Sequence, residues 1–268
     1  MNNPLVSVLM TAYNREKYIA EAIESVLASN YNNFELIITD DCSHDKTVDI
    51  AMSYATKDSR VKVYVNETNL GDYANRNRAA SYATGKYIRY LDSDDFIYYY
   101  GLEVMVKCME KFPDAGFGLR NNSDKRILPV CLTPREAYLE HFFEYGHFDR
   151  PPVAAIIRRD VFNAVGGFSG KRMIGDYEFW FKIGRSYKMV ILPDDLYWYR
   201  THDQQELSSS YAKKNYTKLR SKVLNEALSN PDCPLTTKEI KKIRATNKLN
   251  KILSHIFKFV GKIKSIIL

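Results

Sequence analysis

Two features that often assign a protein to a class are absent from this sequence: a paired-cysteine motif and a long apolar run. Its four cysteines, at positions 42, 108, 131 and 233, form no CxxC pair and match no histidine spacing. This argues against a zinc site or a disulfide framework and suits a reducing compartment. No run of about 18 apolar residues occurs, and no basic segment with a long apolar stretch opens the chain, which argues against a spanning helix or secretion. We therefore expect a cytoplasmic protein.

The body of the chain also has little net charge. The 268 residues are 45% apolar and 26% charged, an ordinary globular composition that excludes a disordered or fibrous protein. The formal charge is +7, yet residues 238–268 hold nine Lys or Arg against one acid, which leaves the rest of the chain at −1. The basic surplus thus belongs to the tail, and we expect no nucleic-acid partner.

Apolar runs and helical patterns alternate over the first hundred residues. Runs rich in β-branched residues predict strands, and segments with apolar residues at helical spacing predict helices between them. The expected strands are 5–13, 34–41, 61–67 and 85–91, and the expected helices are 14–29, 46–58 and 74–84, with Asp45 as a cap of the second. Such alternation predicts an α/β fold with a mostly parallel central sheet flanked by helices, which binds ligands outside the carboxyl ends of its strands.

The second half of the sequence is less regular. A helix is expected at 100–111, a strand at 115–119, and a helix from Thr133, whose capping box is completed by Glu136. Residues 119–133 give the weakest pattern. We expect two halves of one domain, 1–100 and 101–208, followed by a basic helical extension (209–268).

A cluster of aspartates follows the fourth expected strand, in the stretch YLDSDDF. If the extended geometry continues, Asp92 and Asp94 point to one side and Ser93 to the other. Two adjacent carboxylates repel each other unless a cation lies between them, and Mg²⁺ or Mn²⁺ held by carboxylates and substrate phosphates would remove that cost. The alternative is a solvated turn in which Asp95 caps the next helix.

Four segments in order resemble the inverting glycosyltransferases of family two, which have the GT-A fold. They are VSVLMTAYNREKYIAEAIESVL, ITDDCSHDKT, NLGDYANRN and YLDSDDF, and the resemblance covers roughly residues 4–203. Each segment is a weak signal alone, whereas their order and spacing together are a strong one. The family combines an α/β half that binds a nucleotide-sugar with a half that binds the acceptor.

The resemblance implies a set of donor-binding residues. Thr11, Ala12 and Tyr13 would line the nucleotide pocket, Asp40 or Asp41 would accept a hydrogen bond from uracil N3, and Arg76 would reach the base or a phosphate. Asp92 would lie near the ribose, with Ser93 beside it, and Asp94 would bind the metal directly, while Asp95 would be structural. From the residues alone, Tyr13 could equally be a core residue and Arg76 a helix-surface charge. The chain departs from the family at Cys42, where glycine is usual, and at Asn75, where alanine is usual.

An inverting transfer also needs a base for the acceptor hydroxyl. The segment VGGFSGKRMIGDYEFWFKIGR resembles the part of the family that supplies it, and it places Asp176 in the position of the base. Gly175 stands where the family often has glutamate, and Glu178 is the alternative base. The competing interpretation is that Asp176 only caps the following helix.

The segment YWYRTHDQQELSS resembles a family motif whose histidine can complete metal or pyrophosphate binding. His202 is therefore a candidate metal ligand, although a lone histidine beside an aromatic strand can be structural, and Arg200 and Ser208 are candidate phosphate contacts. Aromatic residues could stack on an acceptor sugar or belong to the core. These are Tyr177, Trp180 and Trp198.

The tail reads as a basic amphipathic helix. Its apolar residues recur at one-face spacing: Leu249, Ile252, Leu253, Ile256, Val260, Ile263 and Ile267. We expect residues 238–268 to make peripheral contact with anionic lipid at the inner face of the cell membrane. The alternative is a helix packed on the catalytic body or on a second copy.

Together these features predict a metal-dependent inverting glycosyltransferase that uses Mn²⁺ or Mg²⁺. It would move a sugar from a nucleotide-sugar, UDP-linked, to a hydroxyl of a saccharide or lipid-linked saccharide in surface polysaccharide synthesis. A sugar-phosphate nucleotidyltransferase would need a glycine-rich loop after the first strand, and TAYNREK contains no glycine. A non-catalytic sugar-nucleotide-binding or membrane-associated scaffold is the other alternative, against which the retained Asp92, Asp94 and Asp176 argue.

Overall fold

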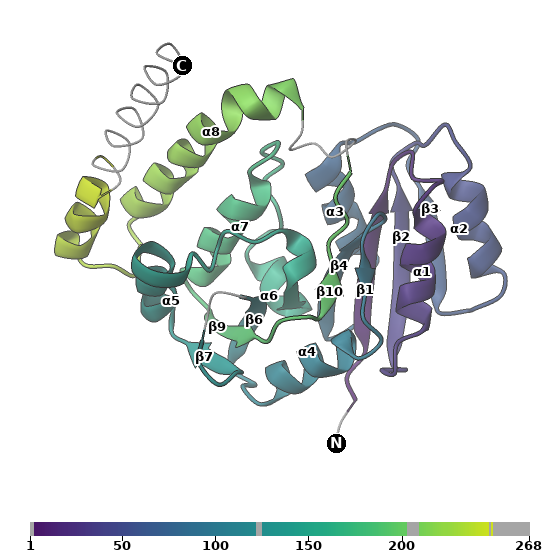
Figure 1. Cartoon of the computed structure of the whole chain (residues 1–268), viewed down its shortest axis with the longest axis horizontal. Coiled ribbons are helices and arrows are strands. Elements are labelled where there is room, and N and C mark those ends of the chain that lie inside the picture. Colours follow the sequence, from purple (N-terminus) through teal and green to yellow (C-terminus); the bar gives the residue numbers. More distant parts are fainter. Residues whose placement is uncertain (1–2, 122–124, 203–208, 247, 249–268) are drawn as a thin grey trace, which may run out of the picture.

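A single eight-stranded sheet runs through the protein in a computed structural model that describes residues 3–121, 125–202, 209–246 and 248 (Figure 1). The strand order is β3-β2-β1-β4-β8-β6-β9-β7. The strands are β1 (Val6–Ala12), β2 (Phe34–Asp40), β3 (Val61–Val65), β4 (Tyr87–Asp92), β6 (Ala115–Arg120), β7 (Val130–Leu132), β8 (Ala155–Arg158) and β9 (Lys188–Leu192). Because β4 pairs with β8, the two expected halves share one sheet.

The first four strands are parallel to one another, as the alternating pattern predicts. Thr11 of β1 is in register with Asp92 of β4, and Ala12 with Asp40 of β2. β8 runs antiparallel to both β4 and β6, whereas β6 and β9 are parallel and β7 is antiparallel to β9. The carboxyl ends of β1, β2 and β4 therefore meet at one edge of the sheet.

Helices cover both faces of the sheet (Figure 1). Side chains of β1 alternate between the faces, so that Val8 and Met10 pack with α1, α2 and α4, while Leu9 packs with α3 and the later helices. The helices are α1 (Ile19–Leu27), α2 (Thr47–Ala55), α3 (Asp72–Ser81), α4 (Gly101–Glu110), α5 (Pro134–Glu140), α6 (Arg159–Ala164), α7 (Gly175–Gly184) and α8 (Ser210–Ser229), with a π-helix at His141–Tyr145 and a 3₁₀ turn at Pro152–Ala154. Residues 237–246 are also helical.

The starts of three helices can be compared with the sequence predictions. The capping box is confirmed: Thr133 accepts from the Glu136 N–H, and Glu136 Oε2 accepts from the Thr133 N–H at 2.8 Å. The first helix begins at Ile19 and not at residue 14, because Asn14 adopts a left-handed conformation (φ 52°). Asp45 Oδ1 accepts from the Thr47 N–H at 2.9 Å, so it does satisfy a donor at the start of α2.

A small second sheet pairs β5 (Phe96–Ile97) with β10 (Tyr197–Trp198) in antiparallel orientation. It attaches the segment after β9 to the turn that follows β4. In the part of the chain that the structure describes, no helix is long and apolar enough to cross a bilayer.

Candidate active site

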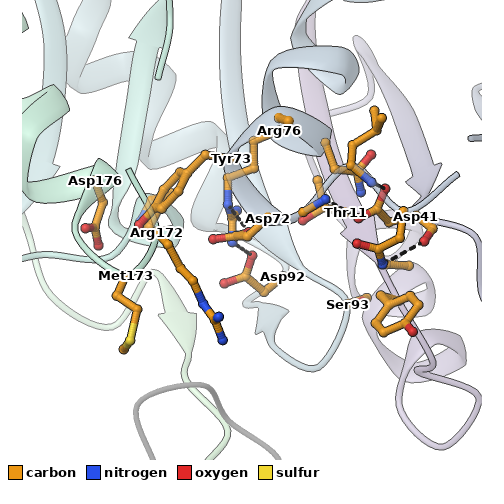
Figure 2. Close-up of a pocket in the computed structure, with 18 of the residues that line it drawn as sticks. Thr11, Asp41, Asp72, Tyr73, Arg76, Asp92, Ser93, Arg172, Met173 and Asp176 are labelled. Carbon is orange, nitrogen blue, oxygen red and sulfur yellow. Dashed lines mark hydrogen bonds and ion pairs between the residues drawn. The ribbon is translucent and has the colours of Figure 1, made fainter. Parts of the chain in front are cut away.

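A cavity of about 990 Å³ lies beyond the carboxyl ends of β1, β2 and β4. One part of its wall comes from those strand ends and from α3, and the opposite part comes from the loop before α7 and from α8. Figure 2 shows the two sets of side chains, with Thr11 and Asp41 on one side, Asp176 on the other, and the Asp72, Arg76 and Asp92 group between them. The position agrees with the rule for parallel α/β sheets.

The end of β1 supplies the first donor-side residues. Thr11, Ala12 and Tyr13 all line the cavity, and Tyr13 is 43% exposed, so it is a wall residue and not a core residue. Asp41 also lines the cavity, and both of its carboxylate oxygens accept hydrogen bonds from the segment 66–71. Oδ1 accepts from the Leu70 N–H at 2.8 Å, and Oδ2 accepts from the Gly71 N–H at 2.9 Å. Asp41 therefore shapes the loop 66–71, whose residues Asn69, Leu70 and Gly71 line the cavity.

Of the two candidate uracil partners, Asp40 does not line the cavity. It is buried, and its carboxylate accepts from the Ser43 N–H at 2.8 Å and from the Ser43 hydroxyl at 2.5 Å. These bonds close the turn after β2. The choice between the two aspartates therefore favours Asp41.

The two departures from the family pattern lie in this same region. Cys42 has a left-handed conformation (φ 67°), which explains why glycine is usual at that position. Asn75 is buried on α3, donates to the Thr39 carbonyl at 3.0 Å, and accepts from the Asn66 side chain at 3.0 Å. Asn66 also donates to Asp41 Oδ1 at 2.9 Å. Asn75 thus connects β2 to the loop that Asp41 organises.

Arg76 is a buried charge between two carboxylates, not a helix-surface charge. Its side chain is 8% exposed, its Nε lies 2.8 Å from Asp72 Oδ1, and its Nη2 lies 2.7 Å from Asp92 Oδ1. Burial opposes the charged form, but the attraction of Asp72 and Asp92 outweighs it and raises the pKa of Arg76. Arg76 therefore brings a permanent positive charge to the centre of the cavity wall.

The aspartates after β4 do not continue as a strand. β4 ends at Asp92, and Ser93 and Asp94 form a turn, so the predicted alternation of side chains past the strand is wrong. All three nevertheless line the cavity. Asp94 Oδ2 lies 3.2 Å from Arg15 Nε and 2.9 Å from His202 Nε2. The turn thus directs Asp92 and Asp94 at different cationic groups.

Asp92 and Asp94 line the cavity and offer carboxylate oxygens, the ligands that Mg²⁺ and Mn²⁺ prefer, whereas His202 does not line it. Asp94 Oδ2 and His202 Nε2 lie 2.9 Å apart, which is a hydrogen-bond distance. Burial, together with the neighbouring Asp94, raises the pKa of Asp92, which shows the cost of two adjacent carboxylates. Among the described residues, no three His, Cys, Asp or Glu side chains form a metal site by themselves. A donor diphosphate and water would have to supply the other ligands.

Arg200 is bonded to two residues of the segment that follows β4, Asp94 and Asp95. Asp95 is buried, does not cap α4, and accepts from the Arg200 N–H at 2.9 Å; burial and then Asp92 raise its pKa to about 8. Arg200 Nε donates to the Asp94 carbonyl at 2.9 Å, and its guanidinium lies 5.0 Å from the Tyr18 ring centre. Arg200 does not line the cavity, and its contacts with Asp94 and Asp95 take the place of the predicted phosphate contact. Ser208 lies outside the described residues.

Asp176 is the second residue of α7 and lines the opposite wall. Its Oδ1 accepts from the Tyr177 N–H at 2.7 Å, so it satisfies one free donor in the first turn of its own helix without being its N-cap. Burial raises its pKa to about 6, although the Tyr177 N–H and then the Tyr73 hydroxyl oppose the rise. Glu178, the alternative base, does not line the cavity and pairs with Lys171 at 2.7 Å. The structure therefore favours Asp176.

None of the three aromatic residues that could have stacked on an acceptor sugar lines the cavity. Trp180 is fully buried and donates to the Arg150 carbonyl at 2.7 Å, and Tyr177 is also a core residue. Trp198 is exposed but stacks on Phe96 at 4.7 Å and does not line the cavity. Because α7 packs one face against the sheet core, its central aromatic residues cannot reach the acceptor. The aromatic residues that line the cavity are Tyr13, Tyr73, Tyr199 and Tyr216.

Several cavity residues were not predicted from the sequence. Arg15 lies three residues after the end of β1, and this position in TAYNREK could have identified it as a residue of the cavity. Arg172 and Met173 lie in the loop between the GGF motif and Asp176, where no pattern distinguishes them. Other lining residues come from distant segments, namely Pro152, Tyr199, Ser209 and Tyr216.

Curated relatives of this chain are glycosyltransferases. An uncharacterised glycosyltransferase of Methanocaldococcus jannaschii is 31% identical over 245 residues, which cover 84% of this chain and 83% of that protein. The Escherichia coli protein named UDP-Glc:alpha-D-GlcNAc-diphosphoundecaprenol beta-1,3-glucosyltransferase WfgD is 40% identical over 140 residues, 50% of this chain and 54% of its own. An uncharacterised glycosyltransferase of Haemophilus influenzae is 47% identical over 97 residues, 36% of this chain and 39% of its own, so the match spans well under half of that relative.

Solved structures share the fold. S. aureus TarS 1-349 in complex with UDP-GlcNAc superposes with a TM-score of 0.70 at 23% identity, covering 89% of this chain and 70% of that one. A mannosyltransferase from Pyrobaculum calidifontis in complex with GDP-Man and Mn²⁺ gives a TM-score of 0.62 at 16% identity, covering 94% of this chain and 81% of that one. The sequence profile described as Glycosyl transferase family 2 matches residues 7–166. The chain therefore belongs to glycosyl transferase family 2 and has the GT-A fold that its ordered motifs predicted.

Proposed function

We propose that this protein is a metal-dependent inverting glycosyltransferase that moves one sugar from a UDP-sugar to a hydroxyl of a lipid-linked saccharide in surface polysaccharide synthesis. The observation that carries the proposal is the shared cavity. Its wall holds Asp92 and Asp94 in one part and the carboxylate of Asp176 in another (Figure 2). A transfer that inverts the sugar needs a leaving-group site and a base on opposite faces of the sugar ring.

Asp176 is the proposed catalytic base. Its carboxylate accepts the proton of the acceptor hydroxyl while the hydroxyl oxygen forms a bond to the anomeric carbon. The bond from that carbon to the β-phosphate oxygen breaks, and the nucleoside diphosphate leaves with the electron pair. A pKa of about 6 leaves most Asp176 side chains deprotonated at neutral pH, and it makes the carboxylate a better proton acceptor than an exposed aspartate.

The other wall stabilises the leaving group. Asp94, Asp92 and His202 would hold Mn²⁺ or Mg²⁺, which supplies a Lewis acid where negative charge grows on the diphosphate. Arg76 and Arg15 both line the cavity near these aspartates, and they add positive charge on the same side. Preorganised charges of this kind stabilise the transition state without reorganising during the reaction.

The choice of donor and acceptor rests on similarity and on the cavity wall. The E. coli relative is named for a UDP-Glc donor and a diphosphoundecaprenol-linked acceptor, and the S. aureus neighbour was solved with UDP-GlcNAc. Tyr13 and Asp41 on the donor side offer an aromatic face and a hydrogen-bond acceptor for a base. Arg172 and Tyr216 line the other side, where the acceptor would enter.

Membrane contact through residues 238–268, at the inner face of the cell membrane, is part of the proposal. Residues 249–268 lie outside the described part of the chain. In the described part of the segment 238–268, Ile243 is buried in the core of the body, so the support comes from exposed lysines on α8, which are Lys213, Lys214, Lys218 and Lys222. Basic residues near an anionic bilayer contribute about 1 kcal/mol each. A lipid-linked acceptor would then be presented near the α8 side of the cavity.

Titration calorimetry with UDP, GDP and dTDP, each with and without Mn²⁺, tests the donor side. We expect UDP to bind tightly only with metal. Transfer is then measured with UDP-sugars and a short-chain diphosphate-linked acceptor. Binding of GDP or dTDP in preference to UDP would contradict the donor assignment, and the absence of binding by all three would favour a non-catalytic, membrane-associated scaffold.

A further inference from the structure

Asp72 is the most exposed of the aspartates that line the cavity in the described part of the chain. Its side chain is 42% exposed, against 23% for Asp92 and 13% for Asp94. Asp41 is buried, and Asp176 is partly buried. Asp72 is therefore the acidic side chain that is most accessible to a molecule in the cavity.

The carboxylate of Asp72 is held in a fixed direction. Asp72 is the first residue of α3, and the Gly71 before it adopts a left-handed conformation (φ 85°) and donates its N–H to Asp41 Oδ2 at 2.9 Å. One turn later, Arg76 Nε lies 2.8 Å from Asp72 Oδ1. Arg76 is itself buried and paired with Asp92. The protein thus anchors both the backbone and the side chain of Asp72.

This anchoring uses only one of the two carboxylate oxygens. Oδ1 is paired with Arg76, whereas Oδ2 of Asp72 has no hydrogen-bond or ion-pair partner among the residues that the structure describes. A hydroxyl is a matching donor for a carboxylate oxygen, and its hydrogen bond to a charged acceptor is stronger than one between neutral groups. Asp72 therefore offers a preorganised acceptor for hydroxyl groups.

Asp72 also lies where the proposed reaction places the transferred sugar. That sugar carries the diphosphate on the side of Asp92 and faces the acceptor hydroxyl on the side of Asp176. Asp72 and Asp92 bind the same guanidinium. The next residue, Tyr73, packs its ring against Gly175, the neighbour of Asp176, because a Cβ atom added to Gly175 would lie 2.8 Å from the ring. Figure 2 shows Asp72 between the donor-side residues and Asp176.

We propose that Asp72 selects the sugar that is transferred. Its carboxylate accepts hydrogen bonds from the hydroxyls of a neutral hexose on the nucleotide, and it repels a donor whose sugar is itself negatively charged, such as a uronic acid. The inference rests on the proposed function and names its sugar class, a UDP-hexose without a charged group. Asp72 acts on the sugar and not on the nucleotide.

The test is titration calorimetry in the presence of Mn²⁺ on wild type and Asp72→Ala. UDP is compared with UDP-glucose, UDP-galactose and UDP-N-acetylglucosamine, and the conjugate that wild type binds most tightly is used in all further measurements. The ratio of its affinity to that of UDP isolates the sugar, because effects on nucleotide binding cancel. Loss of one hydrogen bond to a charged group should lower this ratio by about 10- to 100-fold in Asp72→Ala.

Asp72→Asn tests the charge of the side chain separately. Asparagine keeps the shape and one acceptor oxygen but removes the negative charge. The chosen UDP-hexose is compared with the conjugate of its uronic acid, which has a carboxylate in place of the C6 hydroxymethyl group. Wild type should bind the uronic acid conjugate at least about tenfold more weakly than the hexose conjugate, and Asp72→Asn should remove most of that difference.

Glu103→Ala is the matched control. Glu103 is also an acidic residue in the first turn of a helix, α4, and it pairs with Lys107 four residues later at 2.6 Å, as Asp72 does with Arg76. Glu103 does not line the cavity. The variant therefore removes the same kind of ion pair from a helix surface, and the affinity ratios should equal those of wild type.

Equal losses of affinity for UDP and for the UDP-hexose in Asp72→Ala would overturn the inference, because Asp72 would then act only through Arg76. Unchanged discrimination against the uronic acid in Asp72→Asn would overturn it as well, and so would an equal change of the ratios in Glu103→Ala. If wild type prefers GDP or dTDP to UDP, the same ratios are measured with that nucleotide and its hexose conjugates. If wild type binds none of the three nucleotides, the proposed function fails and the inference fails with it, whereas nucleotide binding without selection of the sugar refutes the inference alone.

Discussion

The two walls of the cavity are built in different ways. On the donor side, β1, β2 and β4 are adjacent and parallel, and the residues that face the cavity follow each strand directly in sequence. On the proposed acceptor side, the wall is assembled from the loop 170–176 and from Ser209 and Tyr216 at the start of α8, which lie far apart in the chain. The first wall is formed by the edge of a regular sheet, whereas the second is formed by the packing of irregular segments.

α3 joins the two walls, and two of its asparagines show the division. Asn75 bonds to Thr39 and Asn66 on the donor side. Asn77 bonds to both backbone groups of Phe168 on the acceptor side. The GGF loop that includes Phe168 has two left-handed glycines, and a Cβ on Gly167 would lie 2.5 Å from Asn77 Oδ1. α3 is therefore the element through which the regular wall positions the irregular one.

The largest expected effect comes from the acceptor wall. Asp176→Asn should lower kcat by about 10²–10⁴, the usual contribution of a general base. UDP binding with Mn²⁺ should be unchanged, because Asp176 lies away from the donor side. A steady-state transfer assay and a UDP titration measure the two quantities. Transfer at the wild-type rate would remove Asp176 from the mechanism and leave the acceptor wall without an identified base.

Asp94→Asn should act on the donor wall instead. The substitution removes a charged metal ligand. Mutation of residues that only support such ligands already lowers metal affinity by about 10–100-fold. Affinity for UDP in the presence of Mn²⁺ should therefore fall at least about tenfold. Binding without metal should change little, because Asp94 would then have no ion to share with the nucleotide. Calorimetry with and without Mn²⁺ checks this. An equal loss under both conditions would mean that Asp94 acts through Arg15 or His202 and not through an ion.

The smallest effects are expected from Asn75→Ala and Asn77→Ala, each of which should change the function of one wall only. Asn75→Ala leaves buried partners unsatisfied in the donor loop, at a cost of about 1–3 kcal/mol in stability, and should weaken UDP binding a few-fold. Asn77→Ala removes bonds to Phe168 and should raise the acceptor KM while UDP affinity is kept. The two variants lie two residues apart on α3, so each controls for the other. If both changed both constants equally, the cavity would behave as one unit.

The proposed donor wall was predictable because short segments of the sequence resemble the motifs of the family in order and spacing. The residues Thr11, Ala12, Tyr13, Asp41, Arg76, Asp92, Ser93 and Asp94 were all predicted and all line the cavity. Strand periodicity alone places the ends of parallel strands at one edge. The sequence did not predict which of Asp40 and Asp41 faces the cavity. This depends on the turn after β2, in which Ser43 donates both of its hydrogen bonds to Asp40. The stacking role of Trp180 failed because the burial of α7 depends on packing against the sheet.

The sequence by itself determined the α/β architecture, the order of the motifs and the chemistry at each strand end, because these depend on short-range periodicity and on residues close together in the chain. Only the tertiary structure decided that Arg76 is buried between Asp72 and Asp92, and that the Tyr73 ring packs against Gly175. Both arrangements depend on the close approach of α3 to segments far away in sequence, and such approaches are set by packing in three dimensions.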